Sequence, residues 1–158
     1  MARWSEVERE APELVARARG FLDAFTHKTI ATIRRDGSPR ISGTELQLAD
    51  GDAWIGSMWA ARKARDLQRD PRYALHSGST SPPGWNGDAK IAGRAVEVTD
   101  PAILDAHRTS ESGEEVSGPY HLFRLEIAEL VVVGLNDARD ALVVESWHEG
   151  RGVTRVER

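Results

Sequence analysis

The hydrophobic and polar positions change their period near residue 28. Before that point, apolar residues recur three and four positions apart, which is the spacing of one helix face: Leu14, Val15, Ala18 and Leu22. Pro12 precedes them, at a position where proline favours the start of a helix. Residues 5–25 are therefore expected to form one broken helix or two short ones.

From residue 28 onward the pattern is typical of strands. Asp36-Gly37 and Asp50-Gly51 are hairpin signals, because glycine adopts positive φ at little cost. The expected elements follow in chain order: strands at 28–34, 39–49 and 53–59, a helix at 60–70 ended by Pro71, strands at 72–79 and 89–99, a helix at 102–111, strands at 120–135 and 141–150, and a basic tail at 151–158.

Six or seven strands joined mostly by tight turns predict a mainly antiparallel sheet that closes into a barrel with short helices. The strands do not alternate with long helices, so a doubly wound parallel sheet is not expected. We expect a single domain over residues 1–158, with an N-terminal helical segment at 1–25 and the barrel at 28–150.

Composition restricts the possible classes of protein. The 158 residues are 40% hydrophobic and 29% charged, as in an ordinary folded domain. The net charge of −4 argues against a general nucleic-acid binder. No apolar run approaches the roughly 20 residues of a membrane span, and the charged N-terminus lacks the apolar core of a signal peptide. The chain has no cysteine, so a cytoplasmic protein without thiolate chemistry is expected.

The helix expected at 60–70 carries its charges in reverse. Arg62, Lys63 and Arg65 stand in its first turns, where a helix is partly positive and each cation costs roughly 0.3–1 kcal/mol. These residues are either solvated surface cations or the start of a phosphate or carboxylate site. In the second case Ser57, just before the turn, would supply a further hydrogen bond.

A resemblance bears on this choice. The segment "GSMWAARKARDLQRDPRYAL" resembles the cofactor-phosphate signature of the flavin-binding split-barrel superfamily related to pyridoxamine 5′-phosphate oxidase. Its elements are a strand, the helix start Arg62-Lys63-Ala64, the turn Asp70-Pro71-Arg72 and another strand. The similarity continues upstream in "IATIRRDGSPRISGTELQLADGDAWIG" and downstream in "AKIAGRAVEVTDP", and it covers about residues 25–107.

The resemblance implies an antiparallel split barrel that forms a homodimer, with flavin mononucleotide in a groove at the subunit interface. Arg62 and Lys63 would hold the phosphate, helped by Ser57. Gly56 and Met58 match positions that flank the cofactor. The backbone of one further segment would lie along the isoalloxazine ring, with a glycine that permits close approach: Ser42, Gly43, Thr44 and Glu45.

Two departures limit what the resemblance implies. The family often has Ser or Thr directly before the Arg-Lys pair, whereas Ala61 stands there and removes one hydroxyl donor. The Arg-x-His element that grips substrate phosphate in pyridoxamine phosphate oxidases cannot be placed in residues 121–158. The implied activity is therefore an oxidoreductase that uses flavin mononucleotide on another small-molecule substrate, with no catalytic side chain singled out.

Two alternatives remain open on the same fold. One is a reductase that uses an 8-hydroxy-5-deazaflavin cofactor, whose longer anionic tail would need more basic residues; Arg34, Arg35, Arg65 and Arg69 would supply them. The other is a non-catalytic flavin-binding or sensor protein, which Ala61 and the missing substrate clamp favour.

The remaining aromatic and imidazole side chains give weaker indications. The five histidines, at 27, 76, 107, 121 and 148, show no close metal-ligand spacing, so ordinary buried or exposed side chains are expected, with a haem or metal site as the minor alternative. Trp85 stands in a loop with glycine on both sides and is either a core anchor or a lid over a flat ring. Trp59 and Trp147 are expected in the barrel core.

Overall fold

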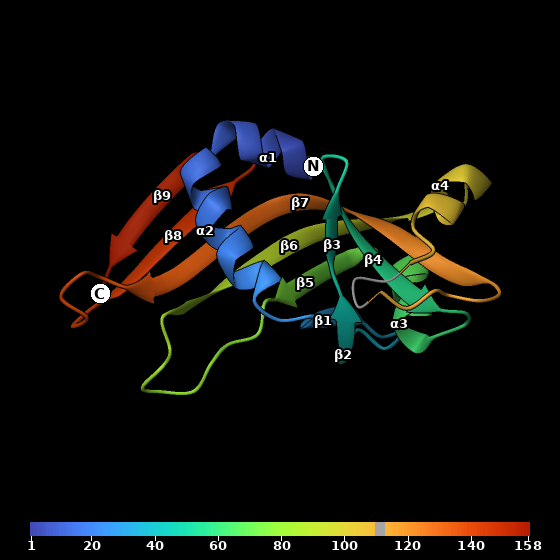
Figure 1. Cartoon of the computed structure of the whole chain (residues 1–158), viewed down its shortest axis with the longest axis horizontal. Helices are drawn as coiled ribbons and strands as arrows, with labels where there is room; N and C mark the ends of the chain where they lie inside the picture. The colour runs from blue at the N-terminus through green and yellow to red at the C-terminus, as the bar shows by residue number, and fades with distance from the viewer. Residues whose placement is uncertain (110–112) are drawn as a thin grey trace.

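One antiparallel sheet of nine strands dominates the computed structural model, which describes residues 1–109 and 113–158. Figure 1 shows the long strands curving across the molecule, with two N-terminal helices on one face. The strands are β1 His27–Ile33, β2 Pro39–Glu45, β3 Gln47–Ala49, β4 Asp52–Met58, β5 Arg72–His76, β6 Gly87–Val98, β7 Tyr120–Leu135, β8 Leu142–His148 and β9 Gly152–Glu157.

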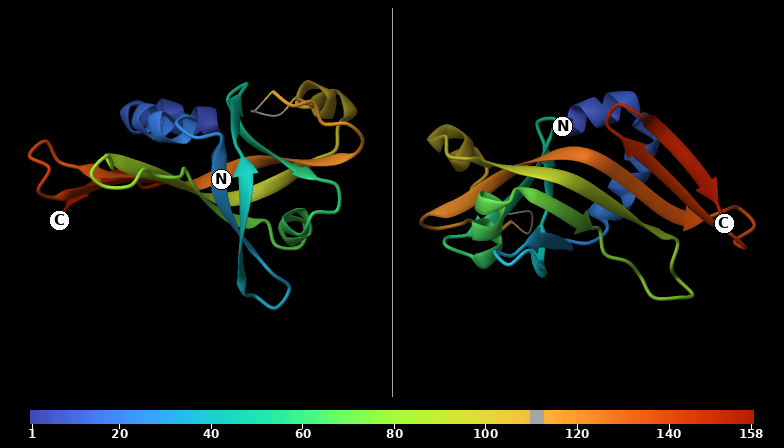
Figure 2. Two further views of the ribbon diagram at one scale, coloured as in Figure 1. Left: turned by 60° about the horizontal axis from the view of Figure 1, so that its bottom comes forward. Right: turned by 180° about the vertical axis from the view of Figure 1, so that it is seen from behind.

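The order of the strands confirms the split-barrel fold class. The main path runs β2-β1-β5-β6-β7-β4-β3, and β8 and β9 extend from β7 as a hairpin. The sheet is not closed. In Figure 2 the β8–β9 hairpin lies at the end of the molecule away from α3, the helix Arg62–Arg69.

The strand count exceeds the expected six or seven for two reasons. The strand expected at 39–49 is divided at Leu46, because β2 pairs with β1 whereas β3 pairs with β4. Leu46 is 3% exposed and packs into the core where the chain changes partners. The expected tail at 151–158 is largely a strand, because β9 forms a complete ladder with β8.

The helices follow the apolar pattern with different limits. The N-terminal segment forms two helices, α1 (Trp4–Glu10) and α2 (Pro12–Asp23), separated at Ala11. The helix expected at 102–111 is shorter: α4 spans Pro101–Ala106, capped by the Asp100 carboxylate, which accepts from two backbone N–H groups. Residues 110 and 111 of that expected helix lie outside the described residues.

The core lies between the sheet and α1 and α2. It contains the apolar face of α2 predicted from the sequence, together with Phe123, Ile30 and Trp147. Trp147 is fully buried, as expected, whereas Trp59 is 62% exposed and does not belong to the core. Among the described residues, no helix is long and apolar enough to cross a membrane.

A smaller apolar cluster lies on β4 and β7. Trp54, Tyr120 and Leu122 are buried there, and Leu104 of α4 packs against them. The Tyr120 hydroxyl donates to the Leu104 backbone carbonyl at 2.5 Å, which holds α4 against the end of β7. This cluster forms one wall of the site described next.

Candidate functional site

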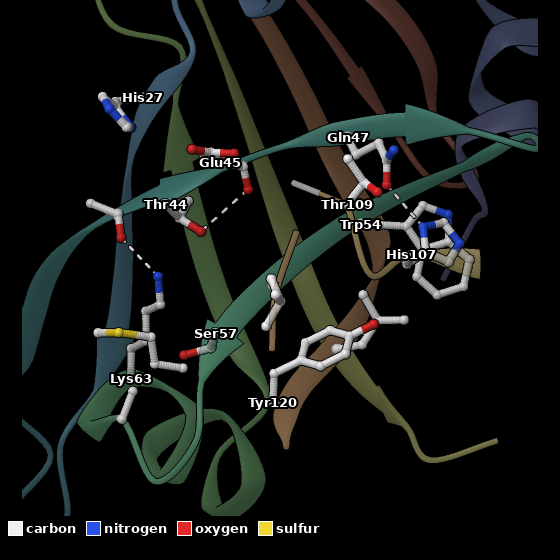
Figure 3. Close-up of a pocket in the computed structure, with 16 residues that line it drawn as sticks. His27, Thr44, Glu45, Gln47, Trp54, Ser57, Lys63, His107, Thr109 and Tyr120 are labelled. Carbon is white, nitrogen blue, oxygen red and sulfur yellow. Dashed lines mark hydrogen bonds between the residues drawn. The ribbon is translucent and has the colours of Figure 1, made fainter. Parts of the chain in front are cut away.

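A cavity of about 460 Å³ opens beside the smaller cluster. Its walls come from β2, β4, the start of α3, the end of α4 and the start of β7 (Figure 3). The lining residues are His27, Gly43, Thr44, Glu45, Gln47, Trp54, Gly56, Ser57, Met58, Ala61, Lys63, His107, Thr109, Val116, Tyr120 and Leu122. Such a volume is in the range of sites for small molecules and cofactors.

Ser57 presents a buried hydroxyl group in this cavity. The residue is 7% exposed, and its Oγ has no hydrogen-bond partner among the described residues. A buried polar group without a partner costs about 1–3 kcal/mol. Ser57 lies next to the last residue of β4, so its position is fixed by the ladder with β7. The hydroxyl is therefore a hydrogen-bonding group held in place without a partner among the described residues.

Lys63 places a cation at the same end of the cavity. Its Nζ donates to the Gly43 carbonyl at 2.8 Å, which connects the first turn of α3 to β2. Burial lowers the pKa of Lys63, while the nearby Glu45 carboxylate acts in the opposite direction. An anion bound here would compensate the desolvation of the ammonium group.

Two glycines leave space in the cavity walls. A Cβ atom built at Gly43 or Gly56 would meet no other atom within 4 Å, and neither backbone has positive φ. Both residues line the cavity. Neither glycine is needed for a turn, so their missing side chains serve to expose backbone to the cavity. Exposed backbone would let a flat ring lie along the strands.

The structure places seven of the nine residues predicted for the cofactor on the cavity wall. They are Gly43, Thr44, Glu45, Gly56, Ser57, Met58 and Lys63. Ser42 is half-buried on β2 and does not line the cavity. Arg62 is exposed and faces a different hollow.

That second hollow, here called the arginine groove, has a volume of about 430 Å³. It lies between α3 and the β1–β2 turn and is lined by Arg34, Arg35, Asp36, Arg40, Arg62, Arg65, Asp66 and Arg69. Burial alone would raise the pKa of Asp66, but hydrogen bonds from Arg40, Thr32 and Arg69 hold it below the usual value. Within the described part of the chain, Arg62 and Arg65 have no side-chain partner. The reversed charges of α3 are therefore divided between two hollows.

The end of the cavity opposite Lys63 contains residues that the sequence pattern does not indicate as a site. His107, at the end of α4, has its Nδ1 atom 2.8 Å from Gln47 Oε1, and its ring lies 4.4 Å from the ring of Trp54 (Figure 3). Burial lowers the pKa of His107, while the charges of Asp50 and Asp52 act to raise it. The sequence contained no signal for this end, because residues 47 and 107 lie 60 positions apart.

A buried histidine holds the turn between β4 and α3. His121 Nε2 accepts a hydrogen bond from the Ala60 N–H at 3.2 Å, and its Nδ1 lies 2.6 Å from Glu97 Oε1. Trp59 stacks on the His121 ring at 4.7 Å. Ala60 has φ of +61°, a left-handed conformation that costs a non-glycine residue roughly 1–2 kcal/mol. These contacts stabilise the strained turn from which Lys63 is presented.

Other predicted candidates lie outside the cavity. Trp85 is half-buried in its loop and does not line the cavity. It therefore does not cover the cavity of its own chain. Over residues 1–109 and 113–158, no three His, Asp or Glu side chains gather as metal ligands would. The β8–β9 hairpin contributes no lining residue to the cavity among the described positions.

Comparison with solved structures supports the fold. A heme-binding protein from Mycobacterium smegmatis matches with a TM-score of 0.64 and 14% identity, over 92% of this chain and 88% of that one. A pyridoxamine 5′-phosphate oxidase-related, FMN-binding protein from Nostoc punctiforme matches with a TM-score of 0.62 and 12% identity, over 91% of this chain and 94% of that one. PhzG from Burkholderia lata, in complex with tetrahydrophenazine-1-carboxylic acid, matches with a TM-score of 0.61 and 16% identity, over 94% of this chain and 87% of that one.

These identities are low and the three proteins bind different molecules, so they show a shared fold alone. No curated protein matches the chain in sequence. The family profile described as pyridoxamine 5′-phosphate oxidase matches residues 14–134, which is well over half of the chain and includes β1 to β7 with α3 between them. The chain therefore belongs to the pyridoxamine 5′-phosphate oxidase family.

Proposed function

We propose that the chain binds flavin mononucleotide in the cavity and uses it as an oxidoreductase. The observation that carries the proposal is the buried Ser57 hydroxyl, which lacks a partner among the described residues and lies at the end of the cavity that contains Lys63. A phosphate group there would accept from Ser57 and neutralise Lys63.

The lining residues fit such a ligand. Lys63 and Ser57 would hold the phosphate, and Ser57 would supply the hydroxyl that Ala61 lacks. Gly43 and Gly56 would let the ring approach the backbone of β2 and β4. Arg62 faces the arginine groove, so the phosphate site rests on Lys63 and Ser57 rather than on the adjacent Arg-Lys pair that the resemblance implied.

The cofactor, when bound, would supply hydride and electron transfer, and the chain's task is to bind and orient it. Trp54, Tyr120 and Leu122 would form an apolar wall that excludes water from the ring. The substrate is a small molecule other than pyridoxamine phosphate, because the sequence of β8 and β9 lacks an Arg-x-His phosphate clamp. A second copy of the chain would complete the mouth of the cavity.

A titration with flavin mononucleotide and riboflavin tests the proposal. The wild-type protein should bind the mononucleotide at least tenfold more tightly than riboflavin, because charge-assisted hydrogen bonds to phosphate are worth about 1.5–3 kcal/mol. Lys63→Gln and Ser57→Ala should each reduce this preference. Arg62→Gln, the matched neighbouring change of charge, should leave it unchanged. Equal affinity of wild type and Lys63→Gln for the mononucleotide would reject the phosphate site.

A deazaflavin cofactor is a second candidate, and the arginine groove favours it. A cofactor with a long anionic tail could place its phosphate at Lys63 and its tail along Arg62 and Arg65, which lack partners among the described side chains. In that case the double variant Arg62→Gln/Arg65→Gln should weaken the deazaflavin and leave flavin mononucleotide unaffected. If a cofactor binds and no nicotinamide or deazaflavin donor reduces it, the non-catalytic binding protein becomes the better description.

A further inference from the structure

The end of the cavity away from Lys63 is built around the ring of His107. Three elements fix this ring: α4, at whose C-terminus it lies, Gln47 of β3 through Nδ1, and Trp54 of β4 through ring contact. The His107 backbone N–H donates to the Ile103 carbonyl at 3.2 Å, and α4 is itself tied to β7 by the Tyr120 hydroxyl. A ring held in this way loses little further freedom when a ligand binds.

The hydrogen bond with Gln47 sets the tautomer of the His107 ring. An amide oxygen only accepts, so Nδ1 carries the proton and Nε2 keeps its lone pair. Nε2 has no hydrogen-bond partner in the part of the chain that the structure describes. Burial lowers the pKa of His107 although the charges of Asp50 and Asp52 act to raise it, and the lowered pKa favours the neutral ring. His107 is thus a positioned acceptor on the cavity wall.

We propose that His107 Nε2 accepts a hydrogen bond from the imide N–H of a pyrimidinedione ring, the ring that flavins and deazaflavins share. The proposal rests on the proposed function, because it concerns the same cavity. The anion-binding group Lys63 and the neutral acceptor His107 lie at opposite ends of one space of about 460 Å³. A single ligand with a phosphate at one end and a ring N–H donor at the other matches both ends, and Trp54 flanks the ring with an apolar surface.

A flavin without the imide proton tests this inference. The probe is 3-methyl flavin mononucleotide, in which a methyl group replaces that hydrogen while the phosphate is kept. The wild-type protein should bind flavin mononucleotide about five- to tenfold more tightly than the methylated form, as loss of one hydrogen bond predicts. His107→Phe, which keeps a ring beside Trp54 but cannot accept, should reduce the preference below about twofold.

Two further variants separate recognition from a general structural effect. His107→Gln places an amide oxygen near the position of Nε2 and should restore most of the preference. His148→Phe changes a histidine on β8, outside the cavity, and should retain the full wild-type preference. A preference that persists in His107→Phe would assign the discrimination to steric exclusion of the methyl group and overturn the inference.

Nitrogen-15 spectra of the histidine rings give a readout independent of activity. The free protein should show His107 as the Nδ1–H tautomer, and its Nε2 resonance should shift with flavin mononucleotide but much less with the methylated form. An Nε2–H tautomer would overturn the inference. Equal affinities for the two flavins, with binding still dependent on Lys63, would reject the role of His107 and leave the proposed function intact. Absence of any flavin binding would reject both.

Discussion

At the scale of single residues, the two adjacent cations at the start of α3 have different surroundings. Lys63 reaches the Gly43 carbonyl inside the cavity, whereas Arg62 is exposed in the arginine groove. The charge pattern left surface cations and an anion site both open, the family resemblance implied the anion site with both residues in it, and neither could separate the two side chains. Their directions depend on the exact start of the helix, which in turn depends on the left-handed Ala60 and its contact with His121.

The ionisation of Lys63 predicts a pH dependence of flavin mononucleotide binding. Burial lowers the pKa of Lys63 below its usual value of 10.5, so the ammonium group loses its proton earlier than in solution as the pH rises. Affinity should therefore fall on alkalinisation, starting below pH 10.5. A titration series in wild type and Lys63→Arg checks this, because arginine keeps its charge over this range. An identical decline in Lys63→Arg would exclude Lys63 as its cause.

The open space at Gly56 predicts a variant that folds but does not bind. A Cβ atom there meets nothing within 4 Å, and valine suits a strand, so Gly56→Val should fold with little change in melting temperature. Its side chain would occupy the cavity, and the affinity for flavin mononucleotide should fall more than tenfold, with a smaller loss in Gly56→Ala. Fluorescence titration and thermal unfolding measure the two effects. Undiminished binding in Gly56→Val would place the ring elsewhere.

At the scale of elements, α2 retains a glycine that its fold does not use. Gly20 is exposed within the helix, and an added Cβ would meet no atom within 4 Å. Gly20→Ala should raise the free energy of unfolding by about 0.5–1 kcal/mol, because alanine loses less backbone entropy in a helix. Denaturant titration measures the change. A decrease would contradict the open surroundings of Gly20.

Most elements could be predicted from local pattern, and the exceptions depend on long-range pairing. The hairpin glycines and the apolar face of α2 act within a few residues, so the sequence is sufficient to indicate them. The division at Leu46 arises because β2 and β3 pair with different strands, and β9 exists because β8 offers it an edge. The residues at the Lys63 end of the cavity lie close together in the chain and were indicated by the family resemblance, whereas the His107 end brings together residues 60 positions apart and was not indicated.

At the scale of the whole molecule, apolar side chains remain exposed on β2, at the end of β4 and in the turn that follows it. Ile41 is 74% exposed, Met58 82% and Trp59 62%. The proposed dimer would cover these side chains, whereas the exposed Leu142, Val153 and Val156 lie on the β8–β9 hairpin. In sedimentation equilibrium the wild-type chain should show twice its mass of 17.4 kDa, and Ile41→Glu should shift it towards the monomer. Val153→Glu, on β9 at the far end, should remain dimeric. A monomeric wild type would reject the dimer.

The division of the α3 cations has a consequence for how binding can change. Neighbouring residues of α3 line different hollows. A single substitution of Arg62 or Arg65 would therefore alter the arginine groove while Lys63 remains in the cavity. With the phosphate site proposed at Lys63, selection or engineering could adjust how strongly the chain retains a ligand's charged extension without altering how that site holds the phosphate. Under the proposed function, the same scaffold would in this way move between a compact cofactor and an extended one by surface substitutions alone.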